Sequence, residues 1–280
     1  MTKNPILSLS QIKTNRDVLL FQLAHDEILV IGCDSAGGIG PNPLDKIKVS
    51  GFILGKFTAR TALMEVLAVN AMPVCIVDAL GVAAKPIGAA ILRGIRSEAK
   101  RAGLDPKLAV TGSTEKNIIV EQTGIGVTVI GTCSRVKLKI GTSLPGDVVV
   151  AVGIPSVGNE VLPAEKAGHI VNSKDILTIR ELTYVHEVIP VGSTGIAHEL
   201  KKFAEGSKLN YTIANQKEVD VYKSAGPATV ALASLPESNV ANLMRQMNKP
   251  VSVIGHLHKQ TSKSCSFNAT NLLFICNPRN

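Results

Sequence analysis

The segment EILVIGCDSAGGIGPNP, residues 27–43, contains the pattern on which the chain is built. Its first seven residues, 27–33, are mostly apolar and predict a buried strand. Glycines and prolines then crowd the stretch from Asp34 to Pro43, which predicts a turn-rich loop. Asp34 stands at the junction, so the sequence predicts a carboxylate at the end of a buried strand.

Strands and helices continue to alternate after this segment. In the first half the pattern predicts an extended segment at 47–54, a helix from Thr58 that Pro73 stops, strands at 74–80, 108–110 and 124–132, a polar loop at 111–117 and a helix at 88–103. In the second half it predicts strands at 148–153, 185–191, 228–234, 251–257 and 272–276, short helices near Ala164 and Ile176, and helices at 196–204 and 237–247. This mixture indicates an α/β or α+β fold.

A cluster of turn residues, GTSLPGD at 141–147, separates the two halves. A length of 280 residues is typical of about two domains. We therefore predict one domain at 1–143 and a second at 144–280.

Composition excludes several classes of protein. Hydrophobic residues make up 45% of the chain and charged residues 19%, so it can bury a core. Every apolar run is shorter than the ~18 residues that suggest a membrane-spanning helix, and the N-terminus lacks a signal-peptide pattern. The five cysteines are scattered and form no CxxC pair; Cys33, Cys75 and Cys133 fall in apolar strands, where we expect buried, reduced thiols. The sequence predicts a cytoplasmic protein without membrane contact.

The net charge of +8 leaves two interpretations open. The basic residues stand in ones and twos with no aromatic residues between them, which is typical of a solvated basic surface. Part of this charge could instead face an anionic small molecule such as a nucleotide. Because no basic cluster of four or more occurs, we do not expect nucleic acid as a partner.

Four acids in the first half stand at or within apolar elements: Asp34, Glu65, Asp78 and Glu115. A lone carboxylate in such a setting costs free energy unless it is paired or binds a cation. The set therefore points to a hard cation such as Mg²⁺, held by carboxylates and substrate phosphates. Helix capping or pairing with lysines would explain each acid separately, and the sequence leaves both interpretations open.

Three segments of the chain are candidates for binding phosphate. GFILGKFT, residues 51–58, resembles a P-loop but has three residues between its glycines and Phe57 after Lys56, so it fails the pattern. The loops TGST at 111–114 and GSTG at 192–195 offer backbone N–H groups to anions, and the second opens a helix. Such loops are also ordinary helix caps.

The order of these motifs carries a resemblance to a known superfamily. DSAGG at 34–38, an acid at Glu65, TGST at 111–114 and GVTVIG at 126–131 are followed by VGIP at 152–155, GSTG at 192–195 and SAGP at 224–227. This succession resembles the aminoimidazole ribonucleotide synthetase-like, or PurM-like, superfamily over nearly the whole chain. The forms DSAGGIG, TGSTEKN and GSTGIA are most similar to the α-ribazole kinases, which phosphorylate the ribonucleoside that becomes the lower ligand of cobalamin.

The resemblance implies a two-domain PurM-like fold whose N-terminal sheet domain pairs with a second subunit in a homodimer, with ATP near that interface. It implies that Mg²⁺ is held by Asp34, by Glu65 and, because Ser113 stands where relatives carry an acid, by Glu115, with Asp78 as the weaker alternative. The remaining implied site residues are Gly112, Ser113, Thr114, Lys46 and Lys56 for ATP, and Gly192, Ser193, Thr194 and His198 for the acceptor.

The expected function is ATP- and Mg²⁺-dependent phosphoryl transfer to a ribonucleoside, with α-ribazole favoured as the acceptor. Either Asp34 or Glu115 would orient the acceptor hydroxyl. Two alternatives stay open: an enzyme like thiamine-monophosphate kinase or another ATP-dependent member of the superfamily, and a nucleotide-binding regulator without catalysis. The replacement by Ser113 favours the regulator.

Overall fold

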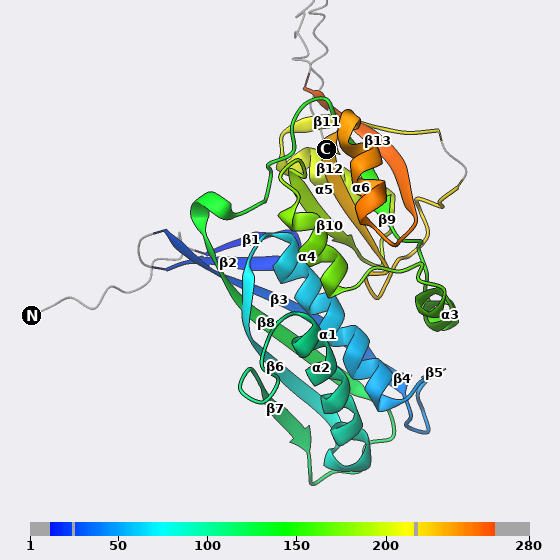
Figure 1. Cartoon of the computed structure of the whole chain (residues 1–280). Coiled ribbons are helices and arrows are strands. Elements are labelled where there is room, and N and C mark those ends of the chain that lie inside the picture. Colours follow the sequence, from blue (N-terminus) through cyan, green and yellow to red (C-terminus); the bar gives the residue numbers. More distant parts are fainter. Residues whose placement is uncertain (1–11, 24–25, 216–217, 261–280) are drawn as a thin grey trace, which may run out of the picture.

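The computed structural model describes residues 12–23, 26–215 and 218–260. Two β-sheets lie one above the other in Figure 1, and the long helix α1 (Gly51–Ala68) runs between them. Every strand of the first sheet precedes residue 135, and every strand of the second follows residue 146. None of the helices in these ranges is long and apolar enough to cross a membrane.

The first sheet has six strands in the order β1-β2-β3-β8-β6-β7. Their bounds are β1 (Ile12–Asn15), β2 (Val18–Gln22), β3 (Glu27–Gly37), β6 (Met72–Ala83), β7 (Val110–Glu115) and β8 (Gly124–Ser134). Neighbouring strands are antiparallel except β6 and β7, which are parallel. The short strands β4 (Ile39–Gly40) and β5 (Ile47–Lys48) form a separate parallel pair beside the end of β3.

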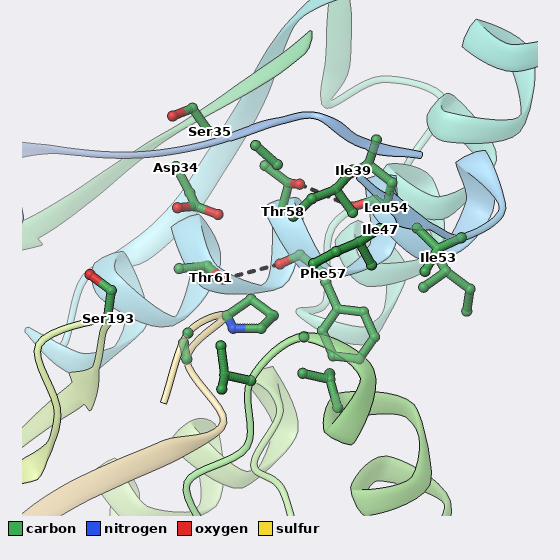
Figure 2. Close-up of a pocket in the computed structure, with 18 of the residues that line it drawn as sticks. Asp34, Ser35, Ile39, Ile47, Ile53, Leu54, Phe57, Thr58, Thr61 and Ser193 are labelled. Atoms are coloured by element: carbon green, nitrogen blue, oxygen red, sulfur yellow. Dashed lines mark hydrogen bonds between the residues drawn. The ribbon is translucent and has the colours of Figure 1, made fainter. Parts of the chain in front are cut away.

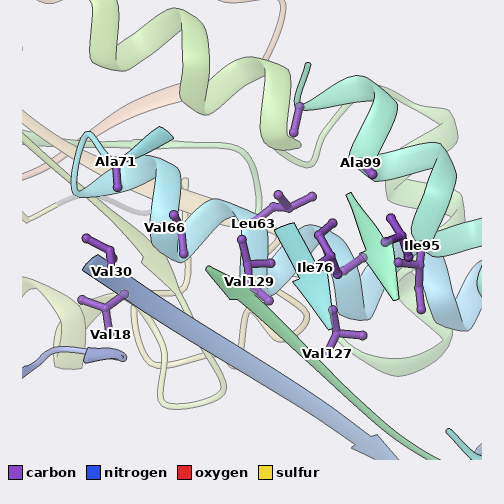
Figure 3. Packing of buried hydrophobic residues seen from close by; sticks show 14 of the residues in the cluster. Val18, Val30, Leu63, Val66, Ala71, Ile76, Ile95, Ala99, Val127 and Val129 are labelled. Carbon is purple, nitrogen blue, oxygen red and sulfur yellow. The ribbon is translucent and has the colours of Figure 1, made fainter. Parts of the chain in front are cut away.

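Helices α1 and α2 (Ala89–Arg101) cover one face of this sheet (Figure 1). Figure 3 shows Val30, Val127 and Val129 from the strands packed against Leu63 and Val66 of α1. Along β6 and β8 these buried residues alternate with more exposed ones on the opposite face of the sheet. That second face carries no described helix, and we call it the open face.

The second sheet is antiparallel, in the order β10-β12-β9-β13-β11. Its strands are β9 (Asp147–Val152), β10 (Glu187–Val191), β11 (Leu209–Ile213), β12 (Val230–Pro236) and β13 (Val251–Lys259). All residues of β9 and β10 are buried, because both faces of this sheet are covered. One face packs on α1, α4 (Ser173–Glu181) and α6 (Val240–Gln246), and the other packs on α5 (Ile196–Gly206).

Helix α1 belongs to both cores. Leu63 and Val66 pack in the cluster of the first sheet, whereas Met64 and Leu67 pack in the cluster of the second. Fourteen of its eighteen residues are buried, and even Arg60 is 1% exposed. A helix that is apolar on all sides is expected where both sides face a core.

Glycines bring α1 and α2 into close contact. A Cβ atom on Gly55 would lie 2.1 Å from the carbonyl oxygen of Ile91, and one on Gly94 would lie 2.1 Å from that of Phe52. The glycines of the segment that resembles a P-loop therefore serve helix packing. The segment forms the first two turns of α1, with Ser50 capping the helix by accepting a hydrogen bond from the Ile53 N–H.

Most predicted elements are confirmed, but four expectations about the first half are wrong. Residues 51–54 are helical instead of extended, because α1 begins at Gly51 and not near Thr58. Strand β3 continues through Asp34 to Gly37, since β8 pairs with it along that length. Strand β7 begins at Val110 and not at Leu108, and residues 111–115 belong to it instead of to a loop, because β6 pairs with them in parallel register. Cys33 is exposed, because it lies on the open face.

Strands β1, β2 and β11 were not predicted, while the predicted strand at 272–276 lies outside the described residues. Cys75 is partly buried and Cys133 is buried, as expected for apolar strands.

We predict that Gly94→Ala lowers the free energy of unfolding by about 1–3 kcal/mol, because the new methyl group would meet backbone that can move only if the two helices separate. Chemical denaturation measures this. Gly206→Ala is the matched control, since Gly206 is also helical and a Cβ there would lie 3.9 Å from the nearest atom, an ordinary contact. Equal stability of the two variants would contradict the close helix contact.

Candidate active site

A cleft of about 450 Å³ lies between the two sheets, above the N-terminal half of α1. Its walls are mostly apolar and come from both halves of the chain. Figure 2 shows the contribution of the first half through Ile39, Ile47, Ile53, Leu54 and Phe57. The second half adds the following lining residues: Val157, Gly158, Val161, Leu162, Gly192, Ser193, Gly226, Pro227 and Ala228. This volume is typical of small-molecule sites, which occupy roughly 300–1,000 Å³.

Among the described residues that line this cleft, Asp34 supplies the only carboxylate. It projects from β3 toward α1, close to Thr61, with Ser193 facing the same space from the second half (Figure 2). Partial burial raises the pKa of Asp34 to about 6, although hydrogen bonds with the Ser35 backbone and the Thr61 side chain work in the opposite direction. A carboxylate of this kind can bind a cation or accept a proton near neutral pH.

A second, more open hollow of about 620 Å³ adjoins the cleft and shares Gly37, Ile39 and Ile47 with it. Its remaining lining residues are Gly38, Lys46, Gly81, Gln122, Thr123 and Gly124. Exposed backbone and a lysine ammonium group are suited to an anion.

The loop that carries Lys46 is fixed by the buried Asp45. The Asp45 carboxylate accepts hydrogen bonds from the Thr123 N–H and hydroxyl and from the Asn42 N–H, at 2.7–2.8 Å. Burial alone would raise its pKa, but these bonds hold the pKa of Asp45 below the usual value.

The other predicted acids lie elsewhere. Glu65 is buried under Gly32, near Arg16, Asp17 and Glu199 at the far end of α1, and its pKa is raised well above the usual value by burial and then by these carboxylates. One oxygen of the Glu115 carboxylate, Oε1, accepts hydrogen bonds from the N–H groups of the next three residues, and these bonds lower the pKa of Glu115.

Asp78 shares a face of the sheet with Asp34 but lies two strands away, because Val127 of β8 pairs with both. A Cβ on the neighbouring Gly112 would lie 2.3 Å from its carboxylate, and burial raises the pKa of Asp78 to about 6. No three acid, histidine or cysteine side chains in the described ranges come together as a metal site. The expectation that the four acids converge on one cation is therefore wrong, since each has a different environment.

The residues predicted for ATP separate in the structure. Lys46 lines the second hollow. Lys56 is ion-paired with Glu165 at 2.8 Å, so its charge is already balanced. Gly112, Ser113 and Thr114 lie in the edge strand β7 and line neither hollow.

The residues predicted for the acceptor also separate. Gly192 and Ser193 line the cleft, whereas Thr194 and His198 are exposed and do not. Four further residues line the cleft and were not predicted as site residues: Thr61, Phe57, Leu162 and Pro227. An apolar residue that lines a cleft has the same pattern as one in a core, so no sequence signal separates the two.

The chain resembles known proteins in structure and not in sequence. No protein-family profile matches it, and no curated protein matches it in sequence. Solved structures do match. The hydrogenase maturation protein HypE in complex with ATP has a TM-score of 0.62 at 16% identity, over 92% of this chain and 82% of its own. Thiamine-monophosphate kinase from Stenotrophomonas maltophilia has a TM-score of 0.59 at 16% identity, over 90% of both chains.

A third match is PurL from Thermotoga maritima complexed with ADP, with a TM-score of 0.60 at 15% identity; it covers 90% of this chain and 44% of the PurL chain. At these identities the likeness is one of fold. The chain has the mixed α/β architecture of PurM-like proteins, as its motif order led us to expect.

We predict that Asp34→Asn raises the free energy of unfolding at pH 8 by about 1–3 kcal/mol. The folded pKa lies above the unfolded one, so ionisation of Asp34 opposes folding above pH 6, and this penalty disappears as the pH falls below about 4. Denaturant titrations at pH 8 and pH 4 measure the difference.

Asp45→Asn is the control of opposite sign, because the pKa of Asp45 is lowered in the fold and its charge stabilises the protein at pH 8. A loss of stability in both variants at pH 8 would contradict the described environment of Asp34.

Proposed function

We propose that the chain is an ATP- and Mg²⁺-dependent kinase that phosphorylates a hydroxyl group of a ribonucleoside, with α-ribazole as the favoured acceptor. The observation that supports this most directly is the small-molecule-sized cleft, which joins an apolar wall to a single carboxylate, Asp34. A ribonucleoside with an uncharged flat base has the same two parts, an apolar ring and a hydroxyl-bearing sugar.

The acceptor base would lie between Phe57, Ile53 and Pro227, where burial of apolar surface stabilises it without a tryptophan. Its ribose would lie toward Asp34 and Ser193, whose oxygens can exchange hydrogen bonds with sugar hydroxyls.

ATP would place its phosphates in the second hollow, beside Lys46 and the backbone of Gly37 and Gly38. Gly112, Ser113 and Thr114 remain proposed ATP contacts at the edge of the first sheet. When bound, Mg²⁺ neutralises phosphate charge during transfer. A single carboxylate fits this metal, because Mg²⁺ in kinases is held by one or two carboxylates together with substrate phosphates, and Asp34 would be that ligand.

In the reaction, the acceptor hydroxyl oxygen bonds to the γ-phosphorus, the bond from this phosphorus to the β–γ bridging oxygen breaks, and ADP leaves. The proton of the hydroxyl must then pass to a base. Of the two acids considered, Asp34 fits better than Glu115, since it lines the cleft while Glu115 is engaged by three backbone N–H groups.

We further propose a homodimer formed through the open face of the first sheet. Cys33, Thr128 and Val77 lie in one cross-strand row on this face, and Val77, Val74 and Met72 are 38–54% exposed. Apolar residues gathered on one face of a sheet are typical of an interface.

The kinase proposal predicts that Mg-ATP and α-ribazole together yield ADP, and that Asp34→Ala abolishes this turnover, because no other acid lines the cleft. A coupled ADP assay measures it, with thiamine monophosphate and no acceptor as parallel reactions. Glu115→Gln is the matched control and should keep most of the activity.

Other outcomes of this assay would favour the alternatives. Turnover with thiamine monophosphate alone would favour the activity named for the Stenotrophomonas maltophilia structure, whose fold this chain shares. ATP binding without turnover on any acceptor would favour a regulator, the interpretation suggested by Ser113.

The dimer proposal predicts that sedimentation velocity gives twice the chain mass of 29.5 kDa, and that Val77→Lys shifts the protein toward monomer by placing a charge in the interface. Leu108→Lys is the control, since Leu108 is 86% exposed and lies outside the strands of the first sheet. A monomeric native protein would contradict the proposal.

A further inference from the structure

Residues 157–168 form one wall of the cleft. Their buried side chains pack in a small cluster that is separate from the two main cores. The segment contains a 3₁₀ turn (Gly158–Glu160) and helix α3 (Val161–Lys166). Figure 1 shows α3 apart from the other helices of the second half. Contacts with Ile53 and Phe57 join α3 to the N-terminal part of α1. The cluster consists of Phe57, Val161 and Ile170, with Ile53 and Ala164 at its edge.

Two apolar side chains of this wall are incompletely covered. Val157 and Leu162 line the cleft, yet they remain 41% and 39% exposed. An apolar group in the cleft would cover this surface, and the same contact would favour ligands with an apolar ring over polar ones of equal size. Phe57 and Ile53 also line the cleft, and they pack with Val161 and Ala164 of the same segment.

Glu165 is the main polar attachment of the segment to α1. Its carboxylate pairs with Lys56 at 2.8 Å and with Arg60 at 2.8 Å, and Arg60 in turn pairs with the fully buried Glu98 of α2 at 2.9 Å. Although burial alone would raise it, the pKa of Glu165 is lowered by these hydrogen bonds and charges. The Arg60 guanidinium also lies 4.5 Å from the centre of the Phe57 ring, so the ion pairs and the cluster support each other.

Elsewhere the segment is weakly held. Glycines with positive φ stand near its two ends, Gly158 at 59° and Gly168 at 76°. The remaining ion pair, between Glu160 and Lys223 at 2.7 Å, is largely exposed and so contributes little to stability. A segment with a small cluster and one partly buried attachment opens at a lower free energy than the two cores.

We propose that residues 157–168 form a lid in which Val157 and Leu162 determine specificity for an apolar ring of the acceptor, and in which Glu165 is the positioning residue that holds the lid on α1. This inference rests on the proposed function for the identity of the acceptor but not for the motion of the lid. Closure of such a segment excludes water from the cleft when the ring is bound.

The lid itself is tested without any substrate, by hydrogen exchange of the native protein and Glu165→Gln. In the native protein we expect amide exchange to be faster in 157–168 than in α2. In Glu165→Gln, exchange in 157–168 should be at least tenfold faster again, while exchange in α2 and β9 stays unchanged. Exchange in 157–168 as slow as in α2, or unaffected by the substitution, would overturn the lid.

The specificity residues are tested with 5,6-dimethylbenzimidazole, which is the base of α-ribazole, as the probe of the apolar ring. Calorimetry should show that Leu162→Ala weakens its binding by about five- to tenfold, and in the ADP assay the KM for α-ribazole should rise by a similar factor with the KM for ATP unchanged. Met244→Ala is the control, since Met244 is 45% exposed and lies on α6, outside the lining of the cleft.

The two proposals fail in different ways. Unaltered probe binding by Leu162→Ala, with α-ribazole turnover intact in the native protein, would overturn the specificity role and leave the kinase standing. Absence of α-ribazole turnover in a protein that binds the probe through Leu162 would overturn the acceptor assignment and leave the lid standing. A native protein that does not bind the probe would overturn the specificity role.

Discussion

The packing of α1 between two sheets is the constraint on which the rest of the structure depends. Because both sides of the helix face a core, its residues must be apolar almost all round, and the one arginine at its centre must be paired, as Arg60 is with Glu98 and Glu165. The same helix supplies Phe57 and Thr61 to the floor of the cleft. A change that shifts α1 would therefore move both cores and the candidate site together.

The two halves of the chain also contact each other near the C-terminal end of α1, away from the cleft. Arg16, between β1 and β2, donates a hydrogen bond of 2.8 Å to the Val188 carbonyl and pairs with Glu187. Glu187 is fully buried, and it also accepts hydrogen bonds from the N–H groups of Gly141, Thr142 and Ser143. A buried charge satisfied in this way favours one arrangement of its partners. The cleft thus lies between halves that are joined near both ends of α1.

Hydrophobic periodicity was enough to predict most strands and helices and the mixed fold class. The cleft residues Asp34 and Ser193 were instead indicated by the resemblance in motif order, with Asp34 also standing at the end of a buried strand. Both kinds of signal failed where distant residues decide the outcome. Glu65 has the sequence context of a metal ligand, but its environment is set by Arg16 and Glu199, which no spacing connects to it. Lys56 was predicted to contact phosphate, but it pairs with Glu165, which lies 109 residues away in the sequence. Strand β3 extends past Asp34 because β8 pairs with it there. The glycines that follow Asp34 made this stretch resemble a loop in the sequence.

The central claim is that the cleft above α1 receives the acceptor with its hydroxyl at Asp34. A crystal structure of the protein with α-ribazole and a non-hydrolysable ATP analogue tests it most directly. We expect the base between Phe57 and Pro227, a ribose hydroxyl within hydrogen-bond distance of the Asp34 carboxylate, and phosphates beside Lys46. An acceptor bound outside the cleft, or a ribose turned away from Asp34, would contradict the account.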